Sequence, residues 1–350
     1  MLAIWKELEN CWETKTSAAI ATIIATSGST YRAAGAKSLI LPDGTIRGTL
    51  SGGCVEGDIY EHAKQVISSG IPQTIRYDFR GDGDLPWGLG VGCNGALNIW
   101  LEPFAPLQQP EKALQTLEIF RKQLPSVTII ASSQPHRYAA GTKYIPGKDQ
   151  ADFPLPAEPG LCTVQHGDVR LELYCEVMKP IPRLFVFGAG PDAVPLVRGA
   201  KLLQWLVTVV DHRPAYANKE RFPEADQIIV VPPGTYPSDL AIRETDYAVI
   251  MTHHFQQDAL FLRRLLSAPL SYLGILGPQH RTERLLPEGA VLADTPLYSP
   301  IGLDIGAETP EEIAISILSE IICHVNGSAG TSLKFRKGPI HQRGAQRDVT

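Results

Sequence analysis

The stretch Arg183-Leu184-Phe185-Val186-Phe187-Gly188-Ala189-Gly190-Pro191-Asp192-Ala193 decides the fold of the second half of the chain. Its first five residues follow the pattern of a buried strand, and the turn after them matches the fingerprint of dinucleotide-binding folds, with Ala193 in the last place. In such a turn the first glycine, Gly188, permits the sharp bend, and the second, Gly190, lets the backbone approach a pyrophosphate. A helix predicted over residues 194–203 offers that group unpaired amides and the positive end of its dipole. Strand, turn and helix in this order predict a Rossmann-type fold.

A second predicted strand, residues 206–210, ends at Asp211. A carboxylate at this place in a Rossmann fold can accept a hydrogen bond from a ribose hydroxyl. Arg213 lies beside it, so NAD and NADP both remain open as ligands, with the acid favouring the unphosphorylated ribose. Pro191 removes one amide from the phosphate-facing turn. The two glycines, Ala193 and Asp211 are therefore our candidate nucleotide-binding residues.

Further apolar runs at residues 227–231, 247–251 and 272–276 alternate with helical segments, as in a parallel sheet. The loops after such strands share the carboxyl edge, where open α/β sheets bind ligands. We therefore expect Thr252-His253-His254 with Asp258, and the loop Gly277-Pro278-Gln279-His280-Arg281, to face the same crevice as the glycine turn. A second histidine follows His253, but adjacent side chains in a loop usually diverge, so we predict no metal site there.

In the first half, Ser51-Gly52-Gly53-Cys54-Val55-Glu56-Gly57-Asp58 sets a thiol between glycines where a helix is predicted to begin. Apolar residues behind it recur at helical spacing, and Gly70 supplies a C-terminal stop. A helix N-terminus favours the thiolate form of a nearby cysteine, which binds metal or attacks sulfur. The alternative for Cys54 is a small buried residue beside a tight turn.

A second thiol, Cys93, lies in the glycine-rich stretch of residues 88–95, just before a strand predicted over residues 97–101. Glycine backbone lets a large ligand approach closely and supplies amide donors for anionic groups. The glycines that we assign to this role are Gly52, Gly53 and Gly92. We therefore hypothesise that Cys54 and Cys93 belong to one site.

Two basic residues precede the Cys54 loop, Arg32 and Lys37. A fixed cation repays its ordering only against a localised anion, such as the phosphate of a pterin or a nucleotide. The alternative is that both are solvated surface charges.

These loops resemble those of the XdhC/CoxI family, the accessory proteins that serve molybdenum hydroxylases such as xanthine dehydrogenase, and the likeness covers most of the chain. In the first half it includes Gly28-Ser29-Thr30-Tyr31-Arg32, Gly35-Ala36-Lys37, Gly52-Gly53-Cys54-Val55-Glu56 and Gly92-Cys93-Asn94-Gly95. In the second half it includes Val186-Phe187-Gly188-Ala189-Gly190, Thr252-His253 with Asp258, and the glycine-containing segments 272–277 and 301–306. Three residues depart from the family pattern: Tyr31 replaces a proline, Asn94 a glycine and Pro191 a histidine.

The resemblance implies an N-terminal mixed α+β domain of the XdhC/CoxI type beside the C-terminal Rossmann-type parallel sheet. It implies a protein that accepts molybdenum cofactor (molybdopterin) as cargo, supports its sulfuration and passes it to an apo molybdenum hydroxylase of the xanthine dehydrogenase type. Cys54 and Cys93 then hold the metal or relay sulfur, while Arg32, Lys37 and Glu56 contact the cofactor. A homodimer and a cysteine desulfurase as a further partner are also implied.

Composition bounds the class of protein. The chain has 350 residues, a formal net charge of −5 and 44% hydrophobic residues, which fits a soluble protein of two or three domains without affinity for nucleic acid. We see no run apolar enough to cross a membrane and no signal peptide, so we expect a cytoplasmic protein. Its six cysteines are scattered without close pairs, which favours reduced thiols over a zinc ribbon or disulfides.

Proline-rich segments mark the expected boundaries, one at residues 103–110 and one at Lys179-Pro180-Ile181-Pro182. We expect an N-terminal domain with the cysteine loops over residues 1–105, a connecting helix and β-rich segment packed with it over 106–179, a Rossmann-type domain over 180–325, and a flexible basic tail over 326–350.

Two functions remain open from the sequence. The first is a cofactor-handling accessory protein, as the resemblance implies. The second is an NAD(P)-dependent oxidoreductase with His253 or His254 as acid or base, which accounts for the second half of the chain but not for the cysteine loops. The chain is a poor candidate for a molybdenum hydroxylase itself, because iron–sulfur centres need clustered cysteines.

Overall fold

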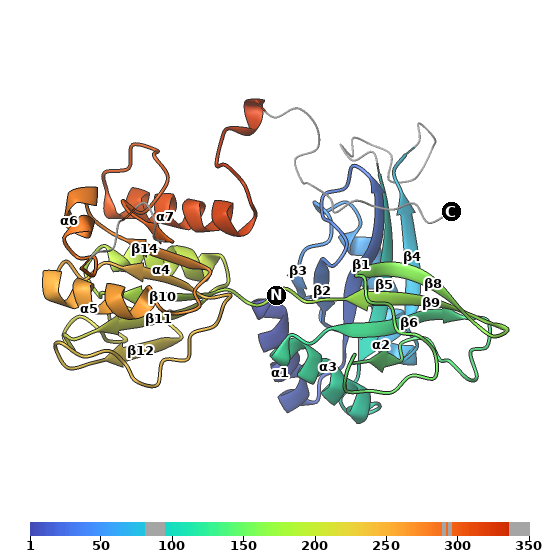
Figure 1. The fold of residues 1–350 in the computed structure, drawn as a ribbon. Helices are drawn as coiled ribbons and strands as arrows, with labels where there is room; N and C mark the ends of the chain where they lie inside the picture. Colours follow the sequence, from blue (N-terminus) through green and yellow to red (C-terminus); the bar gives the residue numbers. More distant parts are fainter. Residues whose placement is uncertain (81–94, 289–291, 293–295, 336–350) are drawn as a thin grey trace. The chain divides into compact units, whose positions relative to one another are not determined.

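The computed structural model describes residues 1–80, 95–288, 292 and 296–335. They form two compact units, Met1–Lys179 and the residues from Pro180 onward, each with its own sheets and core (Figure 1). The second glycine-rich loop, with Gly92 and Cys93, lies outside the described residues, so the hypothesis of a shared thiol site stays a prediction. Of the expected tail, residues 326–335 are described and include a short 3₁₀ helix, Leu333–Phe335.

The first unit contains two antiparallel sheets with the strand orders β3-β2-β1-β5-β4 and β7-β6-β9-β8. The strands of the larger sheet are β1 (Ala18–Gly28), β2 (Lys37–Ile40), β3 (Ile46–Gly48), β4 (Gln73–Asp78) and β5 (Gly95–Phe104). Those of the smaller are β6 (Ser126–Ser132), β7 (Lys143–Tyr144), β8 (Gly160–His166) and β9 (Val169–Glu176). The helices are α1 (Leu2–Thr14), α2 (Glu56–Ser69) and α3 (Pro110–Lys122).

The central strand β1 separates two cores. Successive side chains of a strand point to opposite faces of the sheet. Ala21 and Ile23 therefore pack with the apolar face of α2, while Ala18 and Ile20 pack with α1 and α3. The loop before α2, which carries Cys54, is thus attached to one side of a well-buried sheet.

The second unit contains a parallel sheet of the order β12-β11-β10-β13-β14-β15. Its strands are β10 (Arg183–Phe187), β11 (Leu206–Asp211), β12 (Gln227–Val230), β13 (Tyr247–Ile250), β14 (Tyr272–Ile275) and β15 (Leu297–Tyr298). The helices are α4 (Ala193–Leu202), α5 (Phe255–Leu265), α6 (Gln279–Glu283) and α7 (Pro310–Val325). The predicted Rossmann-type α/β domain is confirmed, and its strand order reverses between β10 and β13.

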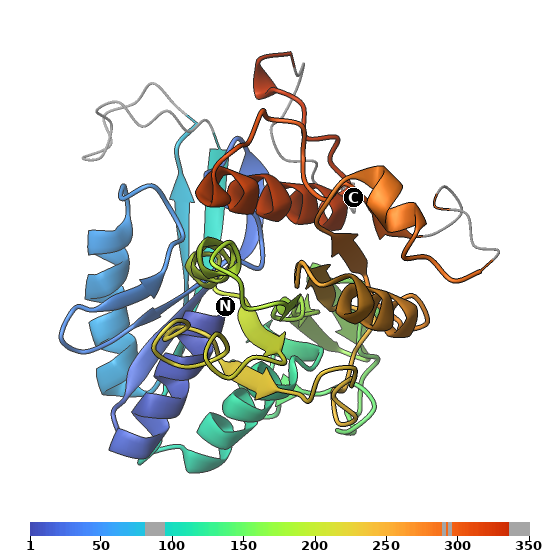
Figure 2. The same cartoon turned by 90° about the vertical axis from the view of Figure 1, so that its left-hand side faces the viewer.

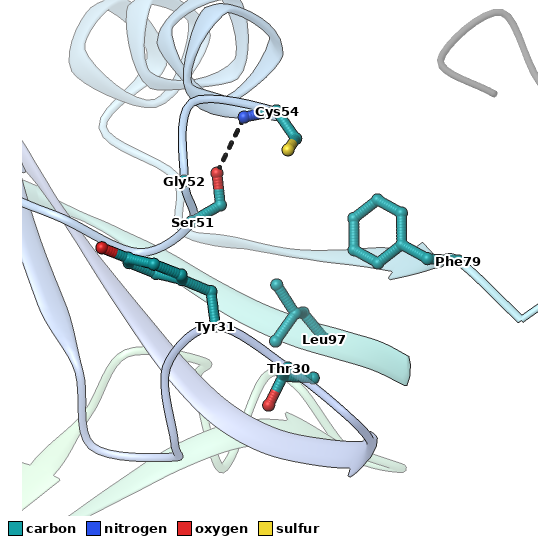
Figure 3. A pocket seen from close by; sticks show the side chains of 7 residues that line it. All are labelled: Thr30, Tyr31, Ser51, Gly52, Cys54, Phe79 and Leu97. Atoms are coloured by element: carbon teal, nitrogen blue, oxygen red, sulfur yellow. Dashed lines mark hydrogen bonds between the residues drawn. The ribbon is translucent and has the colours of Figure 1, made fainter. Parts of the chain in front are cut away.

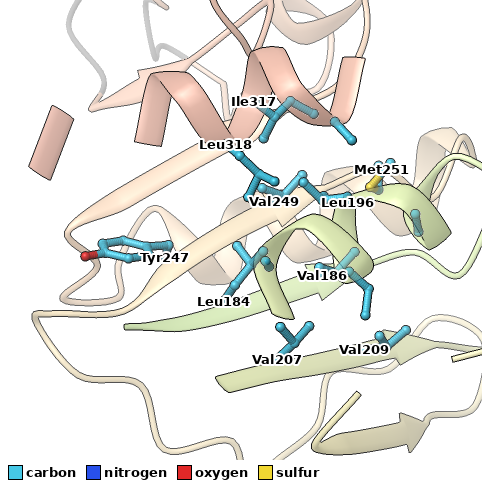
Figure 4. Close-up of a cluster of buried hydrophobic side chains, with 14 of the residues drawn as sticks. Leu184, Val186, Leu196, Val207, Val209, Tyr247, Val249, Met251, Ile317 and Leu318 are labelled. Atoms are coloured by element: carbon cyan, nitrogen blue, oxygen red, sulfur yellow. The ribbon is translucent and has the colours of Figure 1, made fainter. Parts of the chain in front are cut away.

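Strand β10 is buried on both faces, which explains its unbroken apolar sequence. Leu184 and Val186 point into the core that α4 and α7 cover (Figure 4). Phe185 and Phe187 point into the opposite core, which α5 covers. Helices α4 and α7 lie side by side on their face of the sheet (Figures 1 and 2).

No helix among the described residues combines the length and the apolar content that a membrane span requires. Over the same residues, no group of three or more histidine, cysteine or acidic side chains could hold a metal ion, and five cysteines are free thiols.

Candidate functional site

Two side chains brace the loop that carries Cys54. The Ser51 hydroxyl oxygen accepts hydrogen bonds from the backbone N–H groups of Gly53 (3.2 Å), Cys54 (3.1 Å) and Val55 (3.4 Å). The same hydroxyl donates to the carboxylate of Glu56, which also accepts from the Ser51 N–H at 2.9 Å. The backbone around the thiol is therefore held by hydrogen bonds among residues 51–56.

Glu56 has an internal role in this loop. Partial burial opposes ionisation of its carboxyl, but the hydrogen bonds from Ser51 and from backbone N–H groups lower its pKa below the ordinary value. The carboxylate is thus occupied by the protein, and our expectation that Glu56 contacts the cofactor gains no support. Gly53 has φ of +105°, a conformation that favours glycine, so this residue sets the loop shape.

Cys54 itself is exposed, so the alternative of a buried residue beside a turn is wrong. It lies two residues before the start of α2, as predicted. The thiol borders a small depression, or pocket, that is open to solvent (Figure 3). The residues that line the pocket are Thr30, Tyr31, Ser51, Gly52, Cys54, Phe79 and Leu97. A soft nucleophile therefore stands at the edge of a small, mostly apolar hollow.

The two basic residues that we expected near this loop differ in exposure. Arg32 is exposed, next to the pocket residue Tyr31. The Lys37 side chain is only 4% exposed: its Nζ lies 2.9 Å from the Glu176 carboxylate and donates to the Thr22 hydroxyl at 2.9 Å. Lys37 thus joins the two sheets of the first unit, and its predicted role as a phosphate ligand is replaced by this buried ion pair.

In the second unit, the glycine turn is filled by the protein's own side chains. A Cβ on Gly188 would lie 2.4 Å from the carbonyl oxygen of Met251, so this glycine serves a close backbone approach. A Cβ on Gly190 would lie 2.4 Å from Asp192 Oδ1. The Asp192 carboxylate therefore occupies the space that we assigned to a pyrophosphate, and its Oδ2 lies 2.6 Å from His253 Nε2.

Asp211 is likewise engaged. Its fully buried carboxylate accepts from the Ala189 N–H (2.7 Å), from the Arg213 N–H (2.9 Å) and from the Arg213 guanidinium (2.7 and 3.0 Å). Burial opposes ionisation, but these hydrogen bonds hold the pKa of Asp211 below its ordinary value. Because both oxygens have internal partners, the predicted bond to a ribose hydroxyl does not fit this geometry. Ala193 is fully buried in the core.

In the loop after β13, neighbouring side chains make different contacts. Thr252 is buried and donates to Asp258 Oδ1 at 2.5 Å, so its side chain links the start of this loop to α5. The other Asp258 oxygen accepts from Arg281 at 2.6 Å. His253 has φ of +58° and a 60% exposed side chain, whereas His254 caps α5 by accepting from the Gln257 N–H. The two histidines diverge, as predicted.

Sequence reasoning did not single out Asp192, and it named Arg281 only as part of a crevice-facing loop, without a role of its own. Asp192 lies within the fingerprint, and Arg281 follows β14 at the predicted carboxyl edge, so both positions were marked. Their partners, however, come from other strands and were not visible in the sequence. The described residues therefore define a class of protein: a two-unit α/β protein with an exposed thiol on a hydrogen-bonded glycine loop and a Rossmann-type sheet in which Asp211, the usual ribose ligand, is bonded within the protein.

Comparison with known proteins gives the family. A model described as the XdhC Rossmann domain matches residues 184–321, and one described as the XdhC and CoxI family matches residues 11–78. A protein of Bacillus subtilis (strain 168), named as a probable subunit of xanthine dehydrogenase, is 36% identical over 318 residues, which cover 90% of this chain and 95% of the relative. The chain belongs to the XdhC and CoxI family.

Two further similarities extend over most of the chain. The "Molybdenum cofactor insertion chaperone PaoD" of Escherichia coli (strain K12) is 24% identical over 311 residues, 87% of this chain and 82% of the relative. A crystal structure from Bacillus halodurans, described as a xanthine dehydrogenase, is similar with a TM-score of 0.75 and 34% identity, and covers 95% of this chain and 98% of that one.

Proposed function

We propose that this protein is a maturation factor that binds molybdenum cofactor, supports its sulfuration and inserts it into a molybdenum hydroxylase of the xanthine dehydrogenase type. The observation that carries the proposal is the exposed Cys54 thiol on a braced glycine loop at the rim of a pocket. The names of the relatives, a molybdenum cofactor insertion chaperone and a probable subunit of xanthine dehydrogenase, support the same cargo and the same kind of client.

The chemistry of a thiol suits this task. A thiolate is a soft ligand for a metal, and it can carry sulfur as a persulfide. Cys54 is therefore our candidate for holding the cargo or relaying sulfur, with Cys93 as a second thiol. We include a cysteine desulfurase as sulfur donor, a homodimer as the working assembly and the cytoplasm as the compartment, where thiols stay reduced.

The alternative of an NAD(P)-dependent oxidoreductase is not favoured. Asp211, the expected ribose ligand, already accepts from Ala189 and Arg213. Asp192 fills the turn at Gly190 where a pyrophosphate would approach. The cofactor that the Rossmann fold suggests therefore does not fit the residues present.

A retention assay tests the proposal. Parent protein, Cys54→Ser and Cys93→Ser are incubated with molybdopterin, separated from free ligand and assayed for bound pterin by fluorescence after oxidation. We expect each variant to retain at least about tenfold less cofactor, a loss of about 1.4 kcal/mol. Cys162→Ser is the matched control, because this thiol belongs to the core of the first unit. Parent-like retention and delivery to an apo-hydroxylase by both variants would refute the role of the thiols.

A further inference from the structure

Three basic side chains, two arginines and a histidine, stand at the carboxyl edge of the parallel sheet, and each is paired with an aspartate. The pairs are Arg213 with Asp211 (2.7 Å), His253 with Asp192 (2.6 Å) and Arg281 with Asp258 (2.6 Å).

Within each pair the carboxylate lies inside and the cation outside. The Asp211 and Asp258 side chains are 0% and 1% exposed, and Asp192 Oδ1 is buried without a hydrogen-bond partner. The cationic partners are between 23% and 60% exposed. In each pair the basic side chain is therefore the more exposed partner. Because its aspartate already holds that side chain in place, a ligand that binds it loses less free energy to side-chain ordering.

The three cations belong to one neighbourhood. Arg213 follows β11, Asp192 follows β10, His253 follows β13 and Arg281 follows β14, and these four strands are adjacent in the sheet. The pair of Asp192 and His253 bridges β10 and β13, where the strand order reverses and where open α/β sheets bind ligands.

Electrostatic influence links the pairs. The pKa of Arg213 is raised, first by its hydrogen bonds to Asp211 and further by the charge of Asp192. The hydrogen bond to Asp192 raises the pKa of His253, and the charge of Arg281 opposes that rise. The three cations therefore act on a shared region.

Three backbone N–H groups of the glycine turn donate to acceptors within the protein. The N–H of Gly188 donates to the Val210 carbonyl, that of Ala189 to Asp211 and that of Ala193 to the Gly190 carbonyl. Pro191 has no N–H. These three N–H groups of the usual Rossmann phosphate cradle are therefore engaged within the protein, and exposed basic side chains are further donors at this edge.

An aromatic ring lies beside the cations. Phe255 is the first residue of α5, two positions after His253, and is 40% exposed. The guanidinium groups of Arg281 and Arg284 lie 6.0 and 5.3 Å from its ring centroid. An exposed ring next to fixed cations suits a planar ligand that carries a negative charge.

We propose that the carboxyl edge of the parallel sheet binds a phosphate ester of a planar heteroaromatic ring, with Arg213, His253 and Arg281 holding the phosphate. Phe255 stacks on the ring. The inference deepens the proposed function and rests on it, because a pterin cofactor carries such a phosphate; a nucleotide carries the same group.

Binding of two probes, molybdopterin and guanosine 5′-monophosphate, is measured by calorimetry with the full chain. The double variants Asp258→Asn with Arg281→Gln, and Asp211→Asn with Arg213→Gln, remove both charges of a pair and so leave no buried carboxylate unpaired. We expect each to weaken binding about tenfold or more. Arg281→Lys keeps the charge and restores part of the affinity, and Arg198→Gln, an exposed arginine on α4, leaves it unchanged.

The arms separate this inference from the thiol proposal. Cys54→Ser is expected to weaken the binding of molybdopterin and to leave the affinity for the nucleotide unchanged. The charge-pair variants are expected to weaken the binding of both phosphate esters. Binding of molybdopterin alone assigns the edge to the pterin source, and binding of both assigns it to the shared phosphate. Parent-like affinity in folded double variants, checked by thermal unfolding, or no binding of either probe to the parent, overturns the inference.

Discussion

The two units use an internal carboxylate in opposite ways. In the first unit, Glu56 accepts hydrogen bonds from the loop itself, and the group that reaches solvent is the sulfur of Cys54. In the second unit, Asp211 and Asp258 hold guanidinium groups, and the groups that reach solvent are cations. The first unit therefore exposes a sulfur atom on its Cys54 loop, and the second unit exposes guanidinium groups at the carboxyl edge of its sheet.

This difference matches two parts of one kind of cargo. A thiolate prefers a soft metal or sulfur, and an ordered guanidinium prefers a phosphate. The comparison also shows that a glycine-rich loop need not contact a ligand through its backbone, since the turn at Gly190 is occupied by Asp192. The following predictions test whether the Cys54 loop and the basic side chains of the second unit act independently of each other, and how each depends on its neighbouring carboxylates.

The largest effect is expected for Gly188→Ala, which should damage the second unit alone. The residue has φ of +127°, and the new Cβ would lie 2.4 Å from the Met251 carbonyl oxygen, which should cost about 3 kcal/mol or more. Hydrogen exchange measured by mass spectrometry should show faster exchange in β10 and β13 and parent-like protection in β1 and β5.

Gly306→Ala is the control for this prediction, because its φ is +70° but no atom lies within 4 Å of the added Cβ. We expect it to cost about 1–2 kcal/mol from backbone strain alone. Equal losses in the two variants, or faster exchange in β1, would show that the clash or the independence of the units has been misjudged.

A smaller effect is expected for Ser51→Ala in the first unit. It removes the acceptor for three backbone N–H groups, so the unit should lose about 1–2 kcal/mol of unfolding free energy. If the braced loop presents Cys54 to the cofactor, retention should also fall by about tenfold, as when a supporting group of a metal ligand is lost.

Urea unfolding and the retention assay measure these two quantities. Ser68→Ala is the matched control, since its exposed hydroxyl donates to the Gln65 carbonyl on α2 and has no other hydrogen-bond partner among the described residues. If Ser51→Ala is destabilised but retains as much cofactor as the parent, the Ser51 hydrogen bonds stabilise the loop and are not needed for cofactor retention.

The smallest effect is a difference in pH dependence between the units. The hydrogen bond to Asp192 raises the pKa of His253, so its stabilisation is fully present below the ordinary histidine value of about 6.5 and is lost as pH rises through the raised value. The charged groups that face His253 are Asp192, Asp258 and Arg281. For Glu56 the lowered pKa has the opposite sign: its stabilisation is present above the ordinary glutamate value and is lost as pH falls through the lowered one.

Histidine titration by NMR and unfolding at several pH values check this contrast. Asp192→Asn should return the His253 pKa toward its ordinary value and flatten the loss of stability at alkaline pH. The amplitude should be modest because the imidazole is 60% exposed. An unchanged titration in Asp192→Asn would show that another group sets this pKa.

Much of the fold could be predicted from the sequence. The apolar run before Gly188 and the helical spacing after Cys54 correspond to β10 and α2, and both elements begin and end close to where the pattern places them. The thiol loop and the carboxyl-edge loops were also identifiable. These features depend on side-chain periodicity and on backbone freedom at glycine, which act over a few residues.

The partners of the polar side chains could not be predicted. Lys37 looked like a surface cation but pairs with Glu176, and Asp211 looked like a ribose ligand but holds Arg213. Asp192 lies 2.6 Å from His253, which comes from the loop after β13, and this pairing was not visible in the sequence.

The sequence by itself determined the strand before Gly188, the helix after Cys54 and the glycine loops beside them, because those follow from local periodicity and turn geometry. Only the tertiary structure decided which charges are buried together and which face solvent. The reason is physical: a buried carboxylate must find donors among whatever residues the packed sheets bring near it, and that set combines segments far apart in the chain.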